Sequence, residues 1–183
     1  MLAKRSLIPH PAHLDTILDG ISVKVSRVGT DVLKIEYVAV GSIGQISIPA
    51  PEIPEMSEGL WQHTCFEAFV GLGDARAYVE YNFSPSRRWA MYRFEDYREG
   101  KHMPPGFGSP DIYLEQSGPR FALTAWIDLQ PLTFANPVSL GISTVIEAKT
   151  GERSYWALEH SADEPDFHRR DCFIIELPPA PSP

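Results

Sequence analysis

The chain has 183 residues, of which 43% are hydrophobic and 22% are charged, and its formal net charge is −8. This length suffices for one domain with a buried core. The acidic balance, with basic residues clustered only in pairs, argues against a nucleic-acid-binding surface. No apolar stretch of a secretory signal follows the first basic residues, and no segment approaches the length of a membrane span. We therefore expect a cytoplasmic protein with neither a nucleic acid nor a membrane as partner.

Alternating apolar and polar residues predict β-strands along most of the chain, with prolines and glycines between them. The predicted strands cover 21–28, 32–40, 44–48, 64–70, 77–84, 88–95, 111–116, 120–129, 138–149, 154–159 and 172–177. Helical patterns are weak and short. This spacing predicts an all-β protein with a single antiparallel β-sandwich domain over 21–177. Residues 1–20 are expected to form an N-terminal arm, and the proline-rich residues 178–183 a disordered tail.

Two neighbouring predicted strands each carry a glutamate on the same face. Pairing Val70 with Ala77 across the glycine-containing loop puts Glu67 opposite Glu80 and gathers apolar residues on the other face, which is what fixes register in a sheet. Like charges at directly opposite positions destabilise a sheet. The pair therefore predicts a nearby cation, a proton or a ligand.

The next hairpin is expected to extend this face. A turn at 84–87 sets Glu80 beside Met91 and places Trp89 and Arg93 on the glutamate face. The predicted mixed face then consists of Cys65, Glu67, Phe69, Tyr78, Glu80, Asn82, Trp89, Met91 and Arg93. A solvated face would rarely hold so many aromatic residues. Two interpretations stay open: loops bury the face while Arg93 neutralises Glu80, or the face is a ligand-binding groove.

A polar cluster follows the strand at 154–159. Residues 160–171 contain two histidines among acids and arginines, which are metal-ligand types, but their spacing matches no zinc motif and an ordinary loop is the alternative. We expect residues 165–168 to fold back toward the central strands with Phe167 buried. His160 or His168 would then reach the glutamate pair, which would raise the pKa of that histidine.

Catalytic signatures are absent from the sequence. It contains no phosphate-binding glycine loop, no nucleophile elbow and no His-Glu-x-x-His motif. Glu67 and Glu80 in facing positions could form the acid pair of a retaining glycosidase, with one carboxyl protonated near neutral pH. Non-catalytic binding is favoured, because a small sandwich with one such pair offers little else for catalysis. The third hypothesis is a protein-interaction domain whose mixed face is buried.

The central block resembles a known group of domains. Residues 60–69, followed by Tyr-Val-Glu-Tyr-Asn-Phe-Ser-Pro at 78–85 and Trp-Ala-Met-Tyr at 89–92, are similar to the DOMON-like group, which is related to family 9 carbohydrate-binding modules. The resemblance implies a β-sandwich of jelly-roll type with a ligand groove on one sheet. It also implies a carbohydrate as the small polar ligand, with Glu67, Glu80, Asn82 and Trp89 at the groove. Together with the pattern-based candidates, the expected ligand-binding residues are Glu67, Tyr78, Glu80, Asn82, Trp89, Arg93, His160 and His168.

Two departures from this group bear on the expectation. The sugar-binding relatives are typically secreted or attached to an enzyme, and this chain shows neither a signal nor a partner domain. Their pair of stacking tryptophans is also incomplete here: Trp89 is one candidate, and Trp61, Trp126 or Trp156 is the other. Some relatives bind haem, and four methionines and six histidines permit haem ligands without indicating them. No cofactor is indicated, and haem and metal both stay open.

Overall fold

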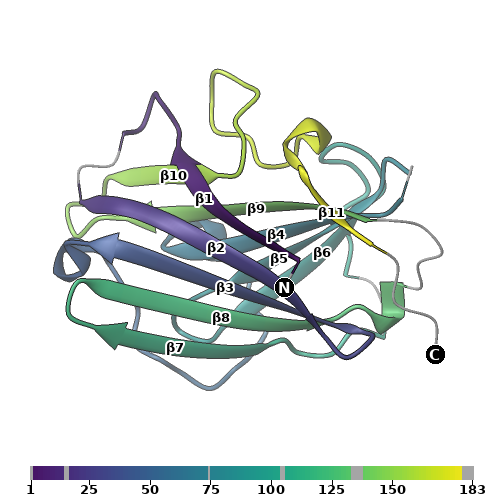
Figure 1. Cartoon of the computed structure of the whole chain (residues 1–183), viewed down its shortest axis with the longest axis horizontal. Coiled ribbons are helices and arrows are strands. Elements are labelled where there is room, and N and C mark those ends of the chain that lie inside the picture. Colours follow the sequence, from purple (N-terminus) through teal and green to yellow (C-terminus); the bar gives the residue numbers. More distant parts are fainter. Residues whose placement is uncertain (1, 15–16, 74, 104–105, 133–137, 179–183) are drawn as a thin grey trace.

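The computed structural model describes residues 2–14, 17–73, 75–103, 106–132 and 138–178, and these are built from strands and a few single-turn 3₁₀ helices (Figure 1). The strands are β1 (Ala3–Pro9), β2 (Leu18–Val28), β3 (Val32–Gly41), β4 (Cys65–Gly71), β5 (Tyr78–Phe83), β6 (Trp89–Phe94), β7 (Asp111–Ser117), β8 (Arg120–Asp128), β9 (Val138–Glu147), β10 (Arg153–Ala157) and β11 (Ile175–Leu177). The 3₁₀ helices are η1 (Ile43–Gln45), η2 (Leu60–Gln62), η3 (Gln130–Leu132) and η4 (Arg170–Cys172). Within the described residues, no helix has the length and apolarity to cross a membrane.

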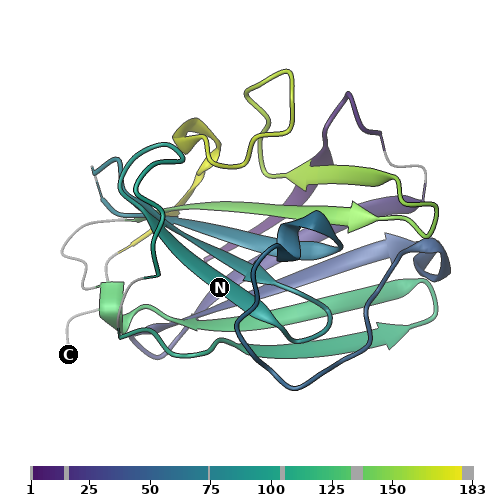
Figure 2. The same ribbon diagram turned by 180° about the vertical axis from the view of Figure 1, so that it is seen from behind.

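The strands form one curled antiparallel sheet whose two halves pack face to face (Figures 1 and 2). Sheet A has the order β1-β2-β3-β8-β7, and sheet B has the order β1-β10-β9-β4-β5-β6, with β11 paired to the beginning of β9. The first strand belongs to both: Ala3–Leu7 pair with β2, whereas Ile8 and Pro9 pair with β10. The predicted all-β antiparallel sandwich with few short helices is confirmed. Its jelly-roll connectivity stays a prediction.

The predicted N-terminal arm is wrong for the residues that form β1. Ala3 and Leu7 are buried in the core, and the strand pairs on both of its edges. The sequence did not indicate this because only two apolar residues of β1 point inward, the strand ends in Pro9, and Pro11 follows closely. The expected tail at 178–183 lies outside the described residues except for Pro178.

The core fills the space between the two sheets. Sheet A contributes Val23, Val25, Leu33, Ile35, Tyr37, Leu123 and Ile127, and sheet B contributes Phe66, Ala68, Val79, Tyr81, Phe83, Ile142 and Trp156. The Tyr37 ring packs edge-on against Phe66, and its hydroxyl donates a hydrogen bond of 2.8 Å to the main-chain carbonyl of Glu67. This contact fixes the strand that carries Glu67 to the opposite sheet.

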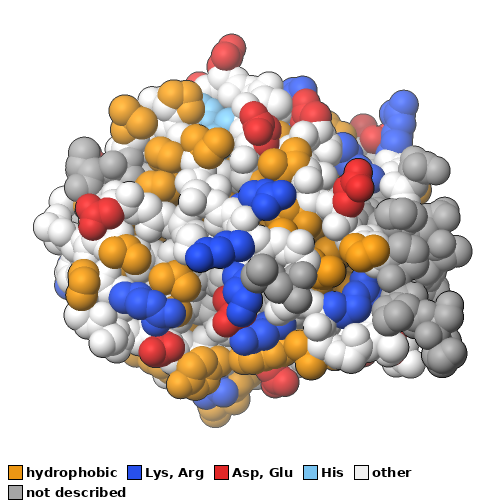
Figure 3. Space-filling view, viewed as in Figure 1, with side chains coloured by type: hydrophobic (Ala, Val, Ile, Leu, Met, Phe, Trp, Pro, Cys, Tyr) orange, Lys and Arg blue, Asp and Glu red, His pale blue; other side chains and the backbone are white. Residues whose placement is uncertain are grey.

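The outer face of sheet A is covered by charged and polar side chains. Lys24 and Lys34 flank Glu36 at 3.1 and 3.0 Å, and the Lys34 ammonium lies 5.5 Å from the centre of the Trp126 ring. In Figure 3, which shows the side of the molecule on which sheet A lies, basic side chains are spread between hydrophobic ones. Sheet B is different, because almost every residue of β4, β5 and β6 is buried.

Candidate functional site

The two glutamates lie on the outer face of sheet B, but in a different register from the predicted one. Glu67 pairs with Asn82, and Glu80 pairs with Phe69. Strand β4 continues to Gly71, which pairs with Tyr78, so the pairing is shifted by two residues from the prediction. A shift of two keeps the face, and the carboxyls become diagonal neighbours instead of facing ones, at about 7–8 Å between backbone positions.

The second hairpin corrects two of the predicted site residues. Trp89 pairs with Phe83, so that Trp89 faces the core and is only 7% exposed. The predicted pairing was off by one residue, which moves a whole strand to the opposite face. Arg93 lies on that same side and pairs with Glu95 at 2.9 Å instead of neutralising Glu80.

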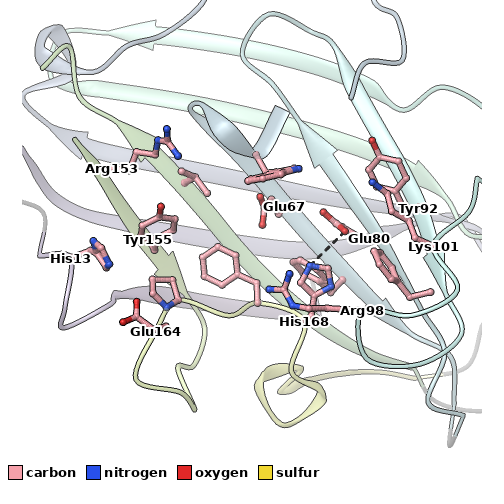
Figure 4. A pocket seen from close by; sticks show the side chains of 16 residues that line it. His13, Glu67, Glu80, Tyr92, Arg98, Lys101, Arg153, Tyr155, Glu164 and His168 are labelled. Carbon is pink, nitrogen blue, oxygen red and sulfur yellow. Dashed lines mark ion pairs between the residues drawn. The ribbon is translucent and has the colours of Figure 1, made fainter. Parts of the chain in front are cut away.

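A groove of about 600 Å³ lies over this outer face. Its floor comes from the strands of sheet B, its rim from η2, residues 10–14, the loop after β6 and the segment that follows β10. Its lining residues are His13, Trp61, Glu67, Phe69, Glu80, Tyr92, Phe94, Arg98, Lys101, Val145, Arg153, Tyr155, Glu164, Pro165, Phe167 and His168. Figure 4 shows the two floor carboxyls at the centre, with Arg153 and Tyr155 toward one end and Tyr92 and Lys101 toward the other.

The floor carboxyls are almost completely buried. Glu67 is 3% exposed and accepts a hydrogen bond of 3.0 Å from the Ser143 hydroxyl. Burial, followed by the charge of Glu80, raises the pKa of Glu67 to about 8. Glu80 accepts a hydrogen bond of 2.7 Å from the Asn82 amide, and burial raises its pKa as well. At neutral pH the pair therefore holds a proton.

The return of the segment after β10 is as predicted in position, with His168 as the histidine that reaches the floor. Its Nε2 lies 3.9 Å from Glu80 Oε2, drawn as the dashed line in Figure 4. Its Nδ1 lies 2.7 Å from the Tyr78 hydroxyl. The same hydroxyl accepts the Arg98 main-chain N–H at 3.2 Å. In the tautomer that carries the imidazole proton on Nε2, the hydroxyl donates to Nδ1 and the Nε2–H lies toward Glu80. Phe167 is half-buried and lines the groove.

The expected raised histidine pKa is wrong for His168. Burial lowers its pKa to about 4, and the nearby charges of Arg98 and Lys101 act in the same direction. The histidine is therefore neutral at pH 7. The error arose because the sequence argument weighed the carboxyl charges but not the loss of solvent around the imidazole.

His160 does not reach the glutamate pair. Its Nε2 donates a hydrogen bond of 2.8 Å to the Ile8 carbonyl, and its ring packs edge-on against His10 at 4.8 Å. It anchors the segment after β10 to β1, outside the groove lining. Among the described residues, no group of three or more His, Cys, Asp or Glu side chains has the arrangement of a metal site.

The structure thus sorts the predicted residues into three groups. Glu67, Glu80 and His168 line the groove. Tyr78 and Asn82 are buried beside it and position His168 and Glu80. Trp89, Arg93 and His160 lie elsewhere. The sequence argument missed Tyr92 and Phe94, which the correct β6 register would have identified, and the loop cations Arg98 and Lys101, which carry no periodic signal.

Comparison with known proteins identifies the fold. No protein-family model and no curated protein matches the chain. A candidate carbohydrate-binding protein from Bacteroides uniformis ATCC 8492 matches with a TM-score of 0.68 and 11% identity, over 93% of this chain and 84% of that one. A family 9 carbohydrate-binding module from Caldicellulosiruptor kristjanssonii, in complex with cellotriose, matches with a TM-score of 0.58 and 10% identity, over 99% and 84%. The chain therefore has the β-sandwich fold of family 9 carbohydrate-binding modules.

Proposed function

We propose that this protein is a non-catalytic module that binds a small saccharide in the groove of sheet B. The observation that carries the proposal is the groove itself: about 600 Å³, with two buried carboxyls on a floor flanked by aromatic rings. This volume falls within the range of about 300–1,000 Å³ that small-molecule sites occupy. The fold shared with a module that holds cellotriose supports the same ligand class.

The lining offers both of the contacts that a sugar needs. Sugar hydroxyls donate to carboxylates and accept from cations, which Glu67, Glu80 and Arg98 provide. The C–H faces of a pyranose pack on aromatic rings, for which Tyr155 and Trp61 are placed at the groove. Trp61 is 48% exposed, so its ring is free to cover a ligand.

The sequence-based argument for a retaining glycosidase does not hold in the observed register. The comparison with a retaining glycosidase required carboxyls in facing positions, and Glu67 and Glu80 are diagonal neighbours. The hydrolysis of aryl glycosides is the direct check. Turnover by the wild-type protein that disappears in Glu67→Gln would replace the binding proposal with an enzymatic one.

The binding proposal is tested by calorimetric titration with a panel of neutral, acidic and amino mono- and disaccharides. We expect at least one saccharide to bind saturably and Trp61→Ala to weaken that binding about tenfold, as loss of a stacked ring does. Trp126→Ala on sheet A is the matched control. The absence of saturable binding across the panel would contradict the proposal.

A further inference from the structure

The floor carboxyls keep hydrogen-bonding capacity that the protein does not fill. Ser143 donates to Glu67 Oε2 and Asn82 donates to Glu80 Oε1. Among the described residues, no donor forms a hydrogen bond with Glu67 Oε1, and Glu80 Oε2 has only His168 Nε2 at 3.9 Å, beyond hydrogen-bond length. Figure 4 shows both carboxyls directed into the groove. Two carboxyls that are at least nine-tenths buried therefore present free acceptors to whatever occupies it.

The cations of the groove make their short contacts with other groups, and at longer range the charges of Lys101 and Arg98 partly offset the effect of burial on the pKa of Glu80. The Arg98 guanidinium pairs with Asp166 at 2.9 Å, and the Lys101 ammonium lies 3.7 Å from the centre of the Tyr92 ring. Arg153 lies toward the opposite end (Figure 4). Within the described part of the chain, no lysine or arginine forms an ion pair with either floor carboxyl. The one ionisable neighbour in contact, His168, is neutral.

The surroundings of the pair also favour a positive charge. Phe69 and Tyr92 are the cross-strand neighbours of Glu80 on either side, and both line the groove. Aromatic faces attract cations, more strongly where water is excluded. A ligand cation placed here would contact two acceptors beside these aromatic side chains, although the Lys101 ammonium already lies over the Tyr92 ring.

Building on the saccharide-binding function proposed above, we propose that the ligand carries a primary ammonium group, as an amino sugar does, and that this group binds between Glu67 and Glu80. Its N–H donors fill the free acceptors of both carboxyls. A neutral sugar leaves one carboxyl to keep its proton, whereas an ammonium group ionises the pair and one proton passes to the buffer.

This proton release gives a pH signature. Because burial raises the pKa of Glu67 to about 8, the carboxyl must lose a proton before it pairs with the ammonium group. Affinity for the amine should therefore rise with pH between about 5.5 and 7, by up to about tenfold per unit. The other groups that face or flank the pair are His13, Tyr37, Glu58, Cys65, Tyr78, Tyr92, Arg98, Lys101, Arg153, Glu164, Asp166 and His168. The pH series is also measured in a His13→Gln variant, so that, among the described residues, His168 is the one histidine that lines the groove during the titration.

The experiment titrates the protein with glucosamine, glucose, N-acetylglucosamine and putrescine at pH 6.5, and with glucosamine from pH 5.5 to 7. We expect glucosamine to bind at least about tenfold more tightly than glucose or N-acetylglucosamine, as for a buried charge-assisted contact. Glu67→Gln and Glu80→Gln should remove this preference and Glu67→Gln should flatten the pH profile. Glu115→Gln on sheet A, a control outside the groove, should retain both.

The outcomes separate the two proposals. If glucose or N-acetylglucosamine binds as tightly as glucosamine or more tightly, the proposed ammonium site is wrong, and the proposed saccharide binding is unaffected. If putrescine binds as tightly as glucosamine and glucose does not bind, the ammonium site is supported and the saccharide-binding function is contradicted. A glucosamine preference that survives in both Glu67→Gln and Glu80→Gln also overturns the inference, because another part of the protein would then bind the ammonium group.

Discussion

Tyr78 and His168 are joined by a hydrogen bond of 2.7 Å that attaches the segment after β10 to the beginning of β5 in sheet B. The Tyr78 ring stacks on the Phe94 ring with 4.9 Å between their centres, and this contact orients the ring that carries the hydroxyl. Burial lowers the pKa of His168 to about 4, so the imidazole is neutral at pH 7, and the bond holds its Nε2 3.9 Å from Glu80 Oε2. One tyrosine on β5 thereby sets the place of a groove histidine.

The neutral histidine predicts an acid-sensitive contribution to stability. The pKa of His168 is about 4 in the folded state and near 6.5 when solvated, so the unfolded chain takes up the proton first. This contribution is complete above about pH 6.5 and is lost as the pH falls to about 4. Urea unfolding of the wild type and His168→Gln should give a difference in unfolding free energy that shrinks by about 1–3 kcal/mol across this window. Parallel pH profiles would show that the imidazole is not desolvated.

The buried carboxyl of Glu67 predicts a pH dependence of the unfolding free energy with the opposite sign. Its pKa is about 8 in the folded state against 4.5 for a solvated glutamate, so folding favours its protonated form. The stabilisation is complete below about pH 4.5 and is lost as the pH rises through about 8. Wild-type stability should therefore fall by a few kcal/mol across this range relative to Glu67→Gln. The same profile in Glu115→Gln and wild type serves as control, and a Glu67→Gln profile parallel to both would contradict the raised pKa.

Two tryptophans should respond in opposite ways to substitution by alanine. Trp89 faces the core, so Trp89→Ala should lower the unfolding free energy by about 3–5 kcal/mol. Trp61 lies at the groove and is half exposed, so Trp61→Ala should change stability by less than about 1 kcal/mol and weaken binding instead. Thermal unfolding and calorimetric titration of both variants check this. A Trp89→Ala protein of wild-type stability would place Trp89 outside the core.

Phe173 packs against the bare backbone of Gly141 in β9. A Cβ at Gly141 would lie 2.5 Å from Phe173 Cδ1, closer than carbon atoms approach. Gly141→Ala should therefore displace the ring and destabilise the protein by about 1–3 kcal/mol. The double variant Gly141→Ala with Phe173→Leu should recover part of this loss, since the smaller side chain can retreat. Additive losses in the double-mutant cycle would argue against a direct clash.

The sequence predicted the fold and the two floor carboxyls of the groove because alternation is a strong signal wherever one face is polar. It failed in β6, where Trp89 and Met91 alternate with Ala90 and Tyr92. Both faces of that strand are apolar, since sheet B is covered on its outer side as well. The turn at 84–88, where Arg87 adopts a positive φ of 70°, contributes to the register there, as do backbone hydrogen bonds of Trp89 and Arg93 to flanking segments.

The groove rim was beyond prediction for another reason. Arg98 and Lys101 come from an irregular loop, and what places them is a contact with Asp166 and a ring of Tyr92. Such pairings across the chain have no counterpart in local sequence. The return of residues 165–168 was predicted because an unneutralised glutamate pair needs a partner, although the partner is a neutral one.

The double membership of β1 has a consequence for the order in which the protein can be made. Ile8 pairs with Ala157, and the groove wall is closed by residues 164–168. A nascent chain can therefore build sheet A early, from β2, β3 and β8, while sheet B waits for β9 and β10 to leave the ribosome. Until then the apolar outer residues Phe69 and Phe94 lack the cover of His168, which makes the half-synthesised chain the stage most exposed to aggregation.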